Sequence, residues 1–458
     1  MPGAKTRVKS DAARYDTVRG AATMALTVFD GGGVSLEDAL LQTKGLVEYD
    51  ELDARFLKLL VSGVTKLKRR LDYQLRFYLA RPAEKLSDKL QNILRLGLFQ
   101  LQFVDRIPQA SAVDESVKLG RYFFGEPKAR MVNAILRSYL REPNKAIFPD
   151  VEDDTERYLA EFYSYPDYFV SYCLREFGAS AAEELLASMN RPPQLTIRVN
   201  LLKAKAPEIE SALERAGLDF QPGAFLEEFY VLSDASISKL SALLKNGKIY
   251  AQDQSAGMAV RLLNPRPGVT LCDLAAAPGG KTTYAASRMR GKGRITAIDK
   301  SRRRLEILVE NCKRMGVKIV APVATDAMIF DPPERYERVM IDPPCSGWGT
   351  AAKHPDLRWR KTEKDIKQMT KIQRKMLEKG ASLLKPGGIL VYSTCTLMRD
   401  ENDQIIEEFL LKNKEFELES AETFFDKSVV SERGFVKTYP CVEGLDGGFA
   451  ARLKRRPA

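Results

Sequence analysis

Histidine is almost absent from this chain, because His354 is the single one among 458 residues. Structural and catalytic metal sites usually combine several histidine, cysteine or acidic ligands, so we expect no metal centre. Catalysis that depends on a histidine base is also disfavoured, since this one residue would have to provide it. His354 is better explained as a hydrogen-bonding residue of a loop.

Cysteine is scarce as well, and no two cysteines form a CxxC pair. A disulfide scaffold is typical of short secreted chains with many cysteines, and this chain has only six. The cysteines therefore remain as candidate nucleophiles. They are Cys173, Cys272, Cys312, Cys345, Cys395 and Cys441.

Long apolar runs are missing. No stretch approaches the ~18 apolar residues of a membrane span, so we expect no membrane partner. The segment 1–10 is basic, but it leads into Asp11 and Arg14 rather than into an apolar core, and no secretory signal is expected. A cytoplasmic protein is the default expectation.

Positive charge is present in excess. Lysine and arginine number 72 against 61 acidic residues, which gives a formal charge of +11. A basic excess attracts the phosphate backbone of nucleic acids. Because many unrelated proteins are mildly basic, this feature alone makes nucleic acid only a candidate partner.

The first 145 residues follow a helical period. Two helix faces carry a glycine, Gly63 and Gly97, where a missing side chain lets another helix approach. Each glycine costs ~1 kcal/mol of helix propensity, so close packing should compensate. The apolar residues of the two faces are Phe56, Leu59, Leu60, Val64 and Leu67, and Leu90, Ile93, Leu94, Leu98 and Leu101. We predict an all-α bundle over residues 1–145. Its charged run, Lys66 with residues 68–70, is expected to be a solvated face, with RNA contact as the less favoured alternative.

Residues 146–264 show a mixed pattern. Two helical stretches lead to Arg191-Pro192-Pro193, where a helix must stop. A strand over 195–200, a helix over 206–216 and a strand over 228–232 follow, which indicates a small α+β module.

Residues 265–458 alternate between strands and helices. This alternation predicts a Rossmann-like parallel sheet with helices on both faces, and ligands bind such sheets at the carboxyl ends of the strands. The expected strands cover residues 269–274, 294–298, 319–323, 338–341 and 388–393.

The first of these strands runs into a turn of small residues, AAAPGGK at 275–281, which feeds a helix N-terminus. The turn is neither GxGxxG nor a triphosphate-binding loop. Asp299 ends the second strand and Asp326 follows the third. Each aspartate alone would be read as a helix cap. Together they indicate a nucleoside ligand without phosphates, and the positive sulfonium of S-adenosylmethionine tolerates such acidic neighbours.

Two cysteines follow the last two strands. Cys345 comes directly after Asp342-Pro343-Pro344, and Cys395 lies in Ser393-Thr394-Cys395-Thr396. A single cysteine would usually be a buried apolar residue. Because consecutive strands are usually neighbours, we expect both to open onto the cofactor cleft.

Carbon-5 methylation of cytosine explains such an arrangement. That carbon is a poor nucleophile until a thiolate adds at carbon 6, and a carboxyl group near N3, a role suited to Asp342, would stabilise the adduct. The segment 353–359, KHPDLRW, is a basic loop with an aromatic residue that could hold an RNA backbone or stack a base.

These motifs resemble the Sun-type family of RNA (cytosine-5) methyltransferases. The matching stretches are AAAPGGK at 275–281, DPPCSG at 342–347, HPDLRW at 354–359 and STCT at 393–396. The resemblance implies that Cys395 attacks the cytosine and that Cys345 assists product release. It also implies that S-adenosylmethionine is held by Ala275, Ala276, Ala277, Pro278, Gly279, Gly280, Lys281, Asp299, Asp326 and Asp342.

The N-terminal bundle resembles the RNA-binding antitermination factor NusB, notably at 107–119 and 132–137. This combination is similar to the bacterial small-subunit rRNA branch of the family, and we expect that rRNA as the partner of a monomeric chain. The sequence departs from the family pattern at Ala275, Pro343, Thr396 and the segment 446–449, but no catalytic group is lost.

Two other functions stay open. Methyltransferases that act on exocyclic amino groups carry a similar Asp-Pro-Pro turn, normally followed by an aromatic residue. Here Cys345 follows, and Cys395 would have no task. A ribosome-assembly protein that binds RNA without turnover is the other alternative, and the intact Lys281, Asp342 and cysteine pair argue against it.

Overall fold

The computed structural model describes residues 17–43, 50–80, 86–233, 237–442 and 444–457. The chain forms two compact units: residues 1–190 with 358–360, and residues 191–357 with 361–458. The basic segment 1–10, on which the signal-peptide expectation rested, lies outside the described residues. Within the described ranges, no helix has the length and apolar character that a membrane crossing needs. The domain boundaries expected near residues 145 and 264 remain proposals.

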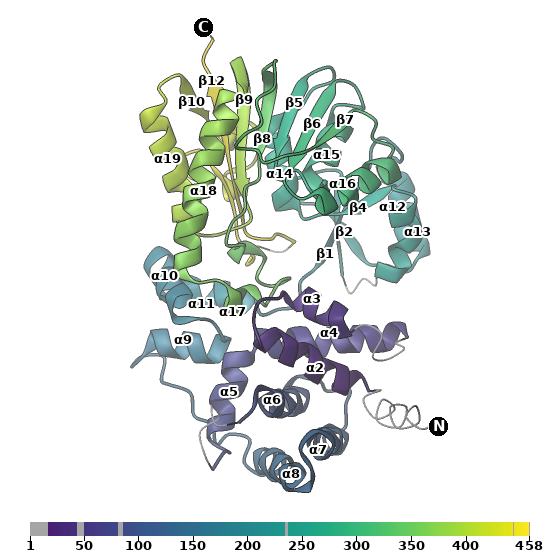
Figure 1. Cartoon of the computed structure of the whole chain (residues 1–458), viewed down its shortest axis with the longest axis vertical. Helices are drawn as coiled ribbons and strands as arrows, with labels where there is room; N and C mark the ends of the chain where they lie inside the picture. The colour runs from purple at the N-terminus through teal and green to yellow at the C-terminus, as the bar shows by residue number, and fades with distance from the viewer. Residues whose placement is uncertain (1–16, 44–49, 81–85, 234–236, 443, 458) are drawn as a thin grey trace, which may run out of the picture. The chain divides into compact units, whose positions relative to one another are not determined.

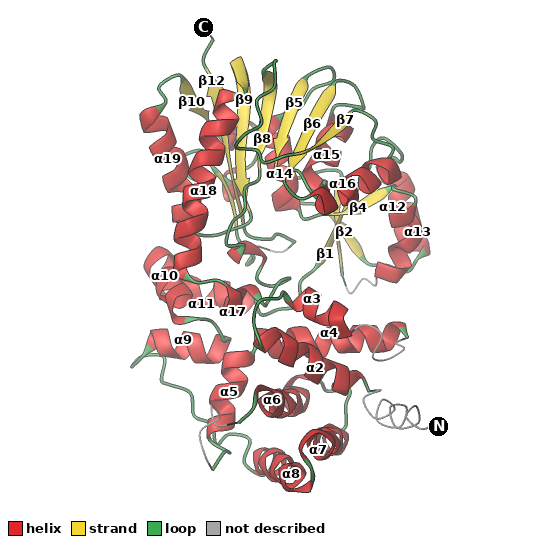
Figure 2. Ribbon diagram, in the orientation of Figure 1, coloured by secondary structure: helices red, strands yellow, loops and turns green. Residues whose placement is uncertain are grey.

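The first unit is built from helices (Figures 1 and 2). Its bundle contains α2 (Val18–Asp30), α3 (Leu36–Thr43), α4 (Glu51–Lys66), α5 (Lys68–Arg76), α6 (Asp88–Phe103), α7 (Gln109–Phe124) and α8 (Glu126–Arg141). Three further helices, α9 (Thr155–Tyr163), α10 (Asp167–Phe177) and α11 (Ala179–Ser188), belong to the same unit. The sequence predicted only two helical stretches here, because the short turns at Ser164 and Gly178 break the period without a long loop.

The two glycines predicted at helix contacts are confirmed in that role. A Cβ atom on Gly63 of α4 would lie 2.1 Å from Cζ of Phe99 on α6. A Cβ atom on Gly97 would lie 2.6 Å from Cδ1 of Leu136 on α8. The predicted face of α4 is wrong at one position, since Leu59 is 47% exposed.

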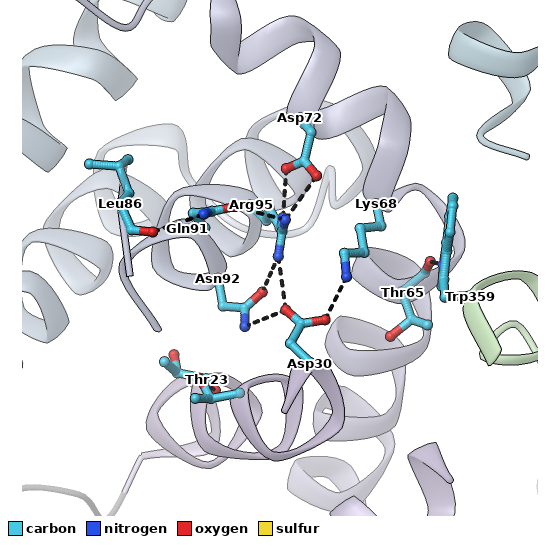
Figure 3. Close-up of polar contacts among 11 residues, drawn as sticks. Thr23, Asp30, Thr65, Lys68, Asp72, Leu86, Gln91, Asn92, Arg95 and Trp359 are labelled. Carbon is cyan, nitrogen blue, oxygen red and sulfur yellow. Dashed lines mark hydrogen bonds and ion pairs between the residues drawn. The ribbon is translucent and has the colours of Figure 1, made fainter. Parts of the chain in front are cut away.

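A buried arginine organises the polar interior of this bundle (Figure 3). Arg95 donates to both carboxylate oxygens of Asp72, at 2.6 and 2.8 Å, and forms a 3.0 Å ion pair with Asp30. Asp30 also accepts a 3.0 Å hydrogen bond from the side-chain amide of Asn92 and forms a 2.6 Å ion pair with Lys68. A buried charge is tolerated when its donors are satisfied in this way.

The expectation that Lys66 and residues 68–70 form a solvated face is wrong. Lys68 pairs with Asp30, and Arg69 pairs with Glu161 at 3.2 Å. The guanidinium of Arg70 lies 4.1 Å from the ring centre of Phe162. The charged heads are used for packing within the unit because α5 is covered by the helices that follow residue 154.

The second unit begins with a small antiparallel sheet in the order β2-β3-β1-β4. Its elements are β1 (Leu195–Val199), α12 (Ala206–Arg215), β2 (Phe220–Pro222), β3 (Phe229–Leu232), η2 (Ile237–Leu240), α13 (Ser241–Lys245) and β4 (Ile249–Ala251). The predicted strands and helix are confirmed as β1, β3 and α12. The sequence missed β2 and β4, which have three residues each and show no period of their own.

The large sheet has the order β10-β12-β9-β8-β5-β6-β7, with β11 paired to β12. Its strands are β5 (Thr270–Leu274), β6 (Arg294–Asp299), β7 (Val320–Ala324), β8 (Tyr336–Ile341), β9 (Leu384–Thr394), β10 (Phe416–Glu419), β11 (Val436–Thr438) and β12 (Gly448–Arg455). The five expected strands are confirmed and pair in parallel from β7 to β9. The strands β10, β11 and β12 add an antiparallel edge that the sequence did not predict.

Helices cover both faces of this sheet, as expected. One face packs against α14 (Gln254–Leu263), α15 (Gly280–Arg288) and α16 (Arg302–Met315). The other packs against α18 (Glu363–Ser382) and α19 (Asp403–Lys412). Alternate residues of each strand serve the two cores, as Val339 and Met340 of β8 do. The remaining short elements are η3 (Trp348–Thr350), α17 (Leu357–Arg360), η4 (Arg399–Glu401), η5 (Ala421–Thr423) and η6 (Lys427–Val429).

Candidate active site

The two cysteines of interest meet where β8 and β9 end. The strands pair in parallel up to Ile341 and Tyr392, so both chains leave the sheet at the same edge. The Sγ atoms of Cys345 and Cys395 lie 3.3 Å apart, and both residues are half-buried. The arrangement brings two sulfur atoms together at the carboxyl edge of the sheet.

The thiol of Cys345 holds its proton strongly. Its hydrogen bond with Cys395 is the main cause that raises the pKa of Cys345 well above its usual range, and burial adds to it. The negative charges of Glu401 and Asp342 act in the same direction. Either sulfur can be the donor in this contact, and the raised pKa favours the protonated form of Cys345.

A lysine and an aspartate form an ion pair next to the cysteines. Nζ of Lys281 lies 2.6 Å from Oδ2 of Asp342, and Oδ1 of Asp342 accepts a 3.4 Å contact from the Ser393 hydroxyl. Burial opposes the positive charge of Lys281, but the Asp342 carboxylate outweighs burial and raises the pKa of Lys281. The lysine therefore stays charged and holds the aspartate in place.

The turn that precedes α15 is shaped by backbone conformation. Gly279 has φ +101°, and a Cβ atom there would lie 3.0 Å from Cγ of Leu308. The buried Arg198 of β1 donates to the carbonyl oxygen of Gly280 at 2.8 Å and to the Thr283 hydroxyl at 3.1 Å. The small antiparallel sheet thus supports the glycine turn of the large one.

A pocket of about 330 Å³ lies beside this turn. Ala275, Asp299 and Asp326 are the members of the expected cofactor set that line it. Asp299 is 3% exposed, and its Oδ1 atom accepts the Ser301 N–H at 2.9 Å. Its Oδ2 atom lies 3.3 Å from the guanidinium of Arg304 as an ion pair but receives no hydrogen bond. A buried carboxylate that ends the second parallel strand suits the hydroxyl groups of a ribose. The full lining is Ala275, Ile298, Asp299, Lys300, Arg304, Asp326, Ala327, Met328, Pro344, Ile372, Lys375 and Met376.

The other expected cofactor residues are not part of the pocket lining. Ala276 and Ala277 are buried, and the carbonyl oxygen of Pro278 accepts a 3.0 Å hydrogen bond from Asn311. Gly280 and Lys281 begin α15. In the described parts of the chain, no three acidic, cysteine or histidine side chains come together as a metal site would need.

The expectation for the loop 353–359 is wrong in its main part. Arg358 is 1% exposed and lies 3.8 Å from the ring centre of Tyr165, and Trp359 donates to the carbonyl oxygen of Thr65 at 2.7 Å (Figure 3). Lys353 pairs with Asp253 and Asp446. These side chains stabilise the protein, and His354 is the exposed residue of the segment.

Two glycines that the sequence analysis did not single out bring the cysteine loops together. A Cβ atom on Gly349 would lie 2.0 Å from the carbonyl oxygen of Gly447, and the Gly349 N–H donates to the carbonyl oxygen of Cys395 at 3.0 Å. Gly349 lies four residues after Cys345, and Gly447 directly precedes β12. These two glycines were the signal that the sequence offered. Glu401 was also missed, because a carboxylate in Arg399-Asp400-Glu401-Asn402 reads as a solvated residue.

Three family comparisons cover most of the chain. Residues 260–454 match the family described as "16S rRNA methyltransferase RsmB/F". Residues 21–141 match the NusB family, and residues 165–238 match the ferredoxin-like domain of RsmF/B-like methyltransferases. The resemblances seen in the sequence are thereby confirmed.

Whole-chain relatives agree. A "Probable ribosomal RNA small subunit methyltransferase B" of Bacillus subtilis is 31% identical over 91% of this chain and 94% of the relative. A protein of the same description from Synechocystis is 34% identical over 88% of this chain and 91% of the relative.

Solved structures are similar too. The crystal structure of PH0851 is 27% identical, with a TM-score of 0.79 over 99% of this chain and all of that chain. A methyltransferase homologue from Pyrococcus horikoshii is 30% identical, with a TM-score of 0.58 over 66% of this chain and 99% of that chain. The chain therefore belongs to the RsmB/F family of S-adenosylmethionine-dependent methyltransferases.

Proposed function

We propose that this protein methylates carbon 5 of a cytosine in small-subunit ribosomal RNA through a covalent adduct with Cys395. The observation that carries the proposal is the 3.3 Å contact between the sulfur atoms of Cys345 and Cys395 beside Asp342. The described relatives are named for action on small-subunit rRNA, which supports the substrate class.

Cys395 is the proposed nucleophile. Because the protonated form of Cys345 is favoured, its S–H can donate a hydrogen bond to Cys395 when that residue attacks as a thiolate. The thiolate adds to carbon 6 of the ring, which makes carbon 5 nucleophilic. Asp342, fixed by Lys281, stabilises the adduct at N3.

The proposed cofactor residues fit a nucleoside. Asp299 and Asp326 face the pocket beside the glycine turn, with Asp299 suited to ribose hydroxyls and Asp326 to the adenine. S-adenosylmethionine supplies the methyl group when it is bound. The carbon-5 proton then passes to solvent water, the double bond between carbon 5 and carbon 6 forms again, and the Cys395 thiolate leaves carbon 6. Cys345 is proposed to assist this release.

The target base must be accessible above its ring plane, so it lies in a loop or is flipped out of a helix. We also propose that the protein works as a cytoplasmic monomer without a metal ion. Light scattering on the purified protein tests the monomer, since a molar mass near twice 51.4 kDa would contradict it.

Trapping on RNA that contains 5-fluorocytosine tests the reaction, because fluorine cannot leave as a cation and the covalent adduct persists. We expect a complex with the wild-type protein and with Cys345→Ala, and none with Cys395→Ala. If all three proteins methylate RNA without a trapped complex, an exocyclic amino group is the target instead. If the wild type neither binds S-adenosylmethionine nor methylates, the protein is a non-catalytic RNA-binding factor.

A further inference from the structure

Glu401 is a buried carboxylate that lies between the two cysteine loops. It ends η4 (Arg399–Glu401) and has no exposed surface. Burial raises the pKa of Glu401, although the hydrogen bonds that it accepts oppose this shift. A buried carboxylate costs free energy unless its oxygen atoms accept hydrogen bonds. The contacts of Glu401 therefore indicate what it does in the structure.

On one side Glu401 holds the segment around Cys345. Its Oε1 accepts the backbone N–H of Ser346 at 2.8 Å, and its Oε2 accepts the Ser346 hydroxyl. Gln373 of α18 donates to Oε1 of Glu401 and to the carbonyl oxygen of Pro344, both at 2.9 Å. Glu401 thus holds Ser346 directly and Pro344 through Gln373.

On the other side Glu401 and its neighbour hold the segment around Cys395. The Thr396 hydroxyl lies 3.3 Å from Oε2 of Glu401 and 2.6 Å from the Ser346 hydroxyl. Asn402 donates to the carbonyl oxygen of Thr396 at 2.9 Å and accepts from the Thr394 hydroxyl at 2.6 Å. The two loops are therefore joined through the residues that follow each cysteine.

We propose that Glu401 is a positioning residue that holds the sulfur atoms of Cys345 and Cys395 at reacting distance by bridging Ser346 and Thr396. The inference deepens the proposed function and rests on it for its catalytic meaning. All four donors to Glu401 are neutral, so the bridge acts through geometry.

The distance between the sulfur atoms can be tested without RNA or cofactor. Diamide oxidises two close thiols to a disulfide: each thiol loses a proton, and two electrons pass to diamide, which becomes the hydrazine. Because cross-linking depends on how often the sulfur atoms meet, we expect Glu401→Ala to slow it about 10-fold. Peptide mass spectrometry identifies the Cys345–Cys395 pair, and Cys345→Ala is the blank.

The same variants are then compared in trapping on 5-fluorocytosine RNA. Glu401→Ala should slow the covalent complex about 10- to 100-fold, since a misplacement near 1 Å costs that much. Glu401→Gln should restore both rates to within about 5-fold, because the amide oxygen still accepts and the hydroxyls can accept its N–H groups. Affinity for S-adenosylmethionine should change less than about 3-fold, as Glu401 does not line the pocket.

Glu408→Ala is the matched control. This carboxylate lies on the next helix and pairs with Arg374 at 2.8 Å, away from both cysteine loops. It should leave cross-linking and trapping unchanged. If Glu401→Ala does not fold, Thr396→Val removes the hydroxyl from the Cys395 side of the bridge at nearly constant volume and should slow cross-linking about 3-fold.

The possible outcomes separate the two proposals. Wild-type rates of cross-linking and trapping in Glu401→Ala, or in Thr396→Val when the first variant is unfolded, overturn the positioning role. The positioning role is also overturned if Glu401→Gln cross-links and traps as slowly as Glu401→Ala, since a neutral side chain of the same shape would then not hold the two loops. Slow cross-linking in Glu401→Ala together with no trapping by the wild type keeps the positioning role and rejects the covalent reaction.

Discussion

The guanidinium group of Arg198 donates a 2.8 Å hydrogen bond to the carbonyl oxygen of Gly280. Arg198 belongs to the small antiparallel sheet, and Gly280 begins the helix that follows the cofactor turn. Burial lowers the pKa of Arg198 to about 10, and the rings of Tyr284 and Tyr250 lie 4.7 and 5.3 Å from the guanidinium. Arg198 is thus a buried, charged donor that holds the turn before α15.

Arg198→Met should weaken binding of S-adenosylmethionine about 10-fold, since the loss of a charged hydrogen bond costs about 1.5–3 kcal/mol. Isothermal calorimetry on folded protein measures the change. Arg452→Met is the matched control, because the buried Arg452 donates to the carbonyl oxygen of Leu262 and lies over the Phe424 ring without touching the turn. Equal losses of affinity in both variants would contradict the assignment.

The two pocket aspartates should contribute unequally. Asp299 is buried, and its Oδ2 atom pairs with Arg304 at 3.3 Å without a hydrogen bond. Asp326 is exposed, and its Oδ1 accepts the Met328 N–H at 2.9 Å. We expect Asp299→Asn to raise the dissociation constant for S-adenosylmethionine about 10- to 100-fold and Asp326→Asn about 3-fold. A larger increase of the dissociation constant in Asp326→Asn than in Asp299→Asn would contradict the assignment of Asp299 to the ribose.

Gly349→Ala should destabilise the second unit by about 1–3 kcal/mol, because the added methyl group meets the backbone of Gly447. The Cys395 loop should loosen at the same time, since the Gly349 N–H binds its carbonyl oxygen. Urea unfolding and 5-fluorocytosine trapping measure the two effects. Gly31→Ala is the control, as its Cβ atom would lie 3.4 Å from the nearest heavy atom. Unchanged stability in Gly349→Ala would show that the backbones separate easily.

Stability should fall as pH rises through the titration of Asp273. Burial raises the pKa of Asp273 to about 7, although the Thr282 hydroxyl donates to it at 2.6 Å and opposes the shift. The unfolded chain releases this proton near pH ~3.9. Between these values the folded state holds a proton that the unfolded state lacks, so the benefit is complete below pH ~4 and is lost above pH ~7.

Asp273→Asn removes this titration. We expect its stability relative to the wild type to improve between pH 5 and pH 8, by on the order of 1–4 kcal/mol. Thermal unfolding of both proteins at the two pH values measures the difference. An unchanged difference would mean that Asp273 is ionised throughout, held by its polar neighbours.

Arg358→Met should lower the stability of the first unit by about 1–3 kcal/mol, because buried carbonyl oxygens lose their donor. Four carbonyl oxygens accept from Arg358: those of Lys66, Tyr163, Ser164 and Met189. Urea unfolding measures the loss, and RNA affinity of the folded variant should stay within about 3-fold of the wild type. The exposed His354→Ala is the control. A large loss of RNA affinity without loss of stability would return this segment to the RNA surface.

The sequence by itself determined the local features of this protein. The apolar periods placed α4, α6 and the five parallel strands, and small residues marked the turn at 275–281 and the helix contacts at Gly63 and Gly97. The positions of Cys345 and Cys395 after consecutive strands were also readable, because neighbouring parallel strands end at one edge of a sheet. Each of these features depends on residues close together in the chain.

Only the tertiary structure decided which long-range partners the charged side chains have. Arg358, Lys68 and Glu401 look like surface residues in the sequence, but each is satisfied by groups far away in the chain. The raised pKa values of Cys345 and Asp273 follow from burial and from neighbours on other strands. Burial and pairing depend on how separate segments pack, and no local pattern carries that information.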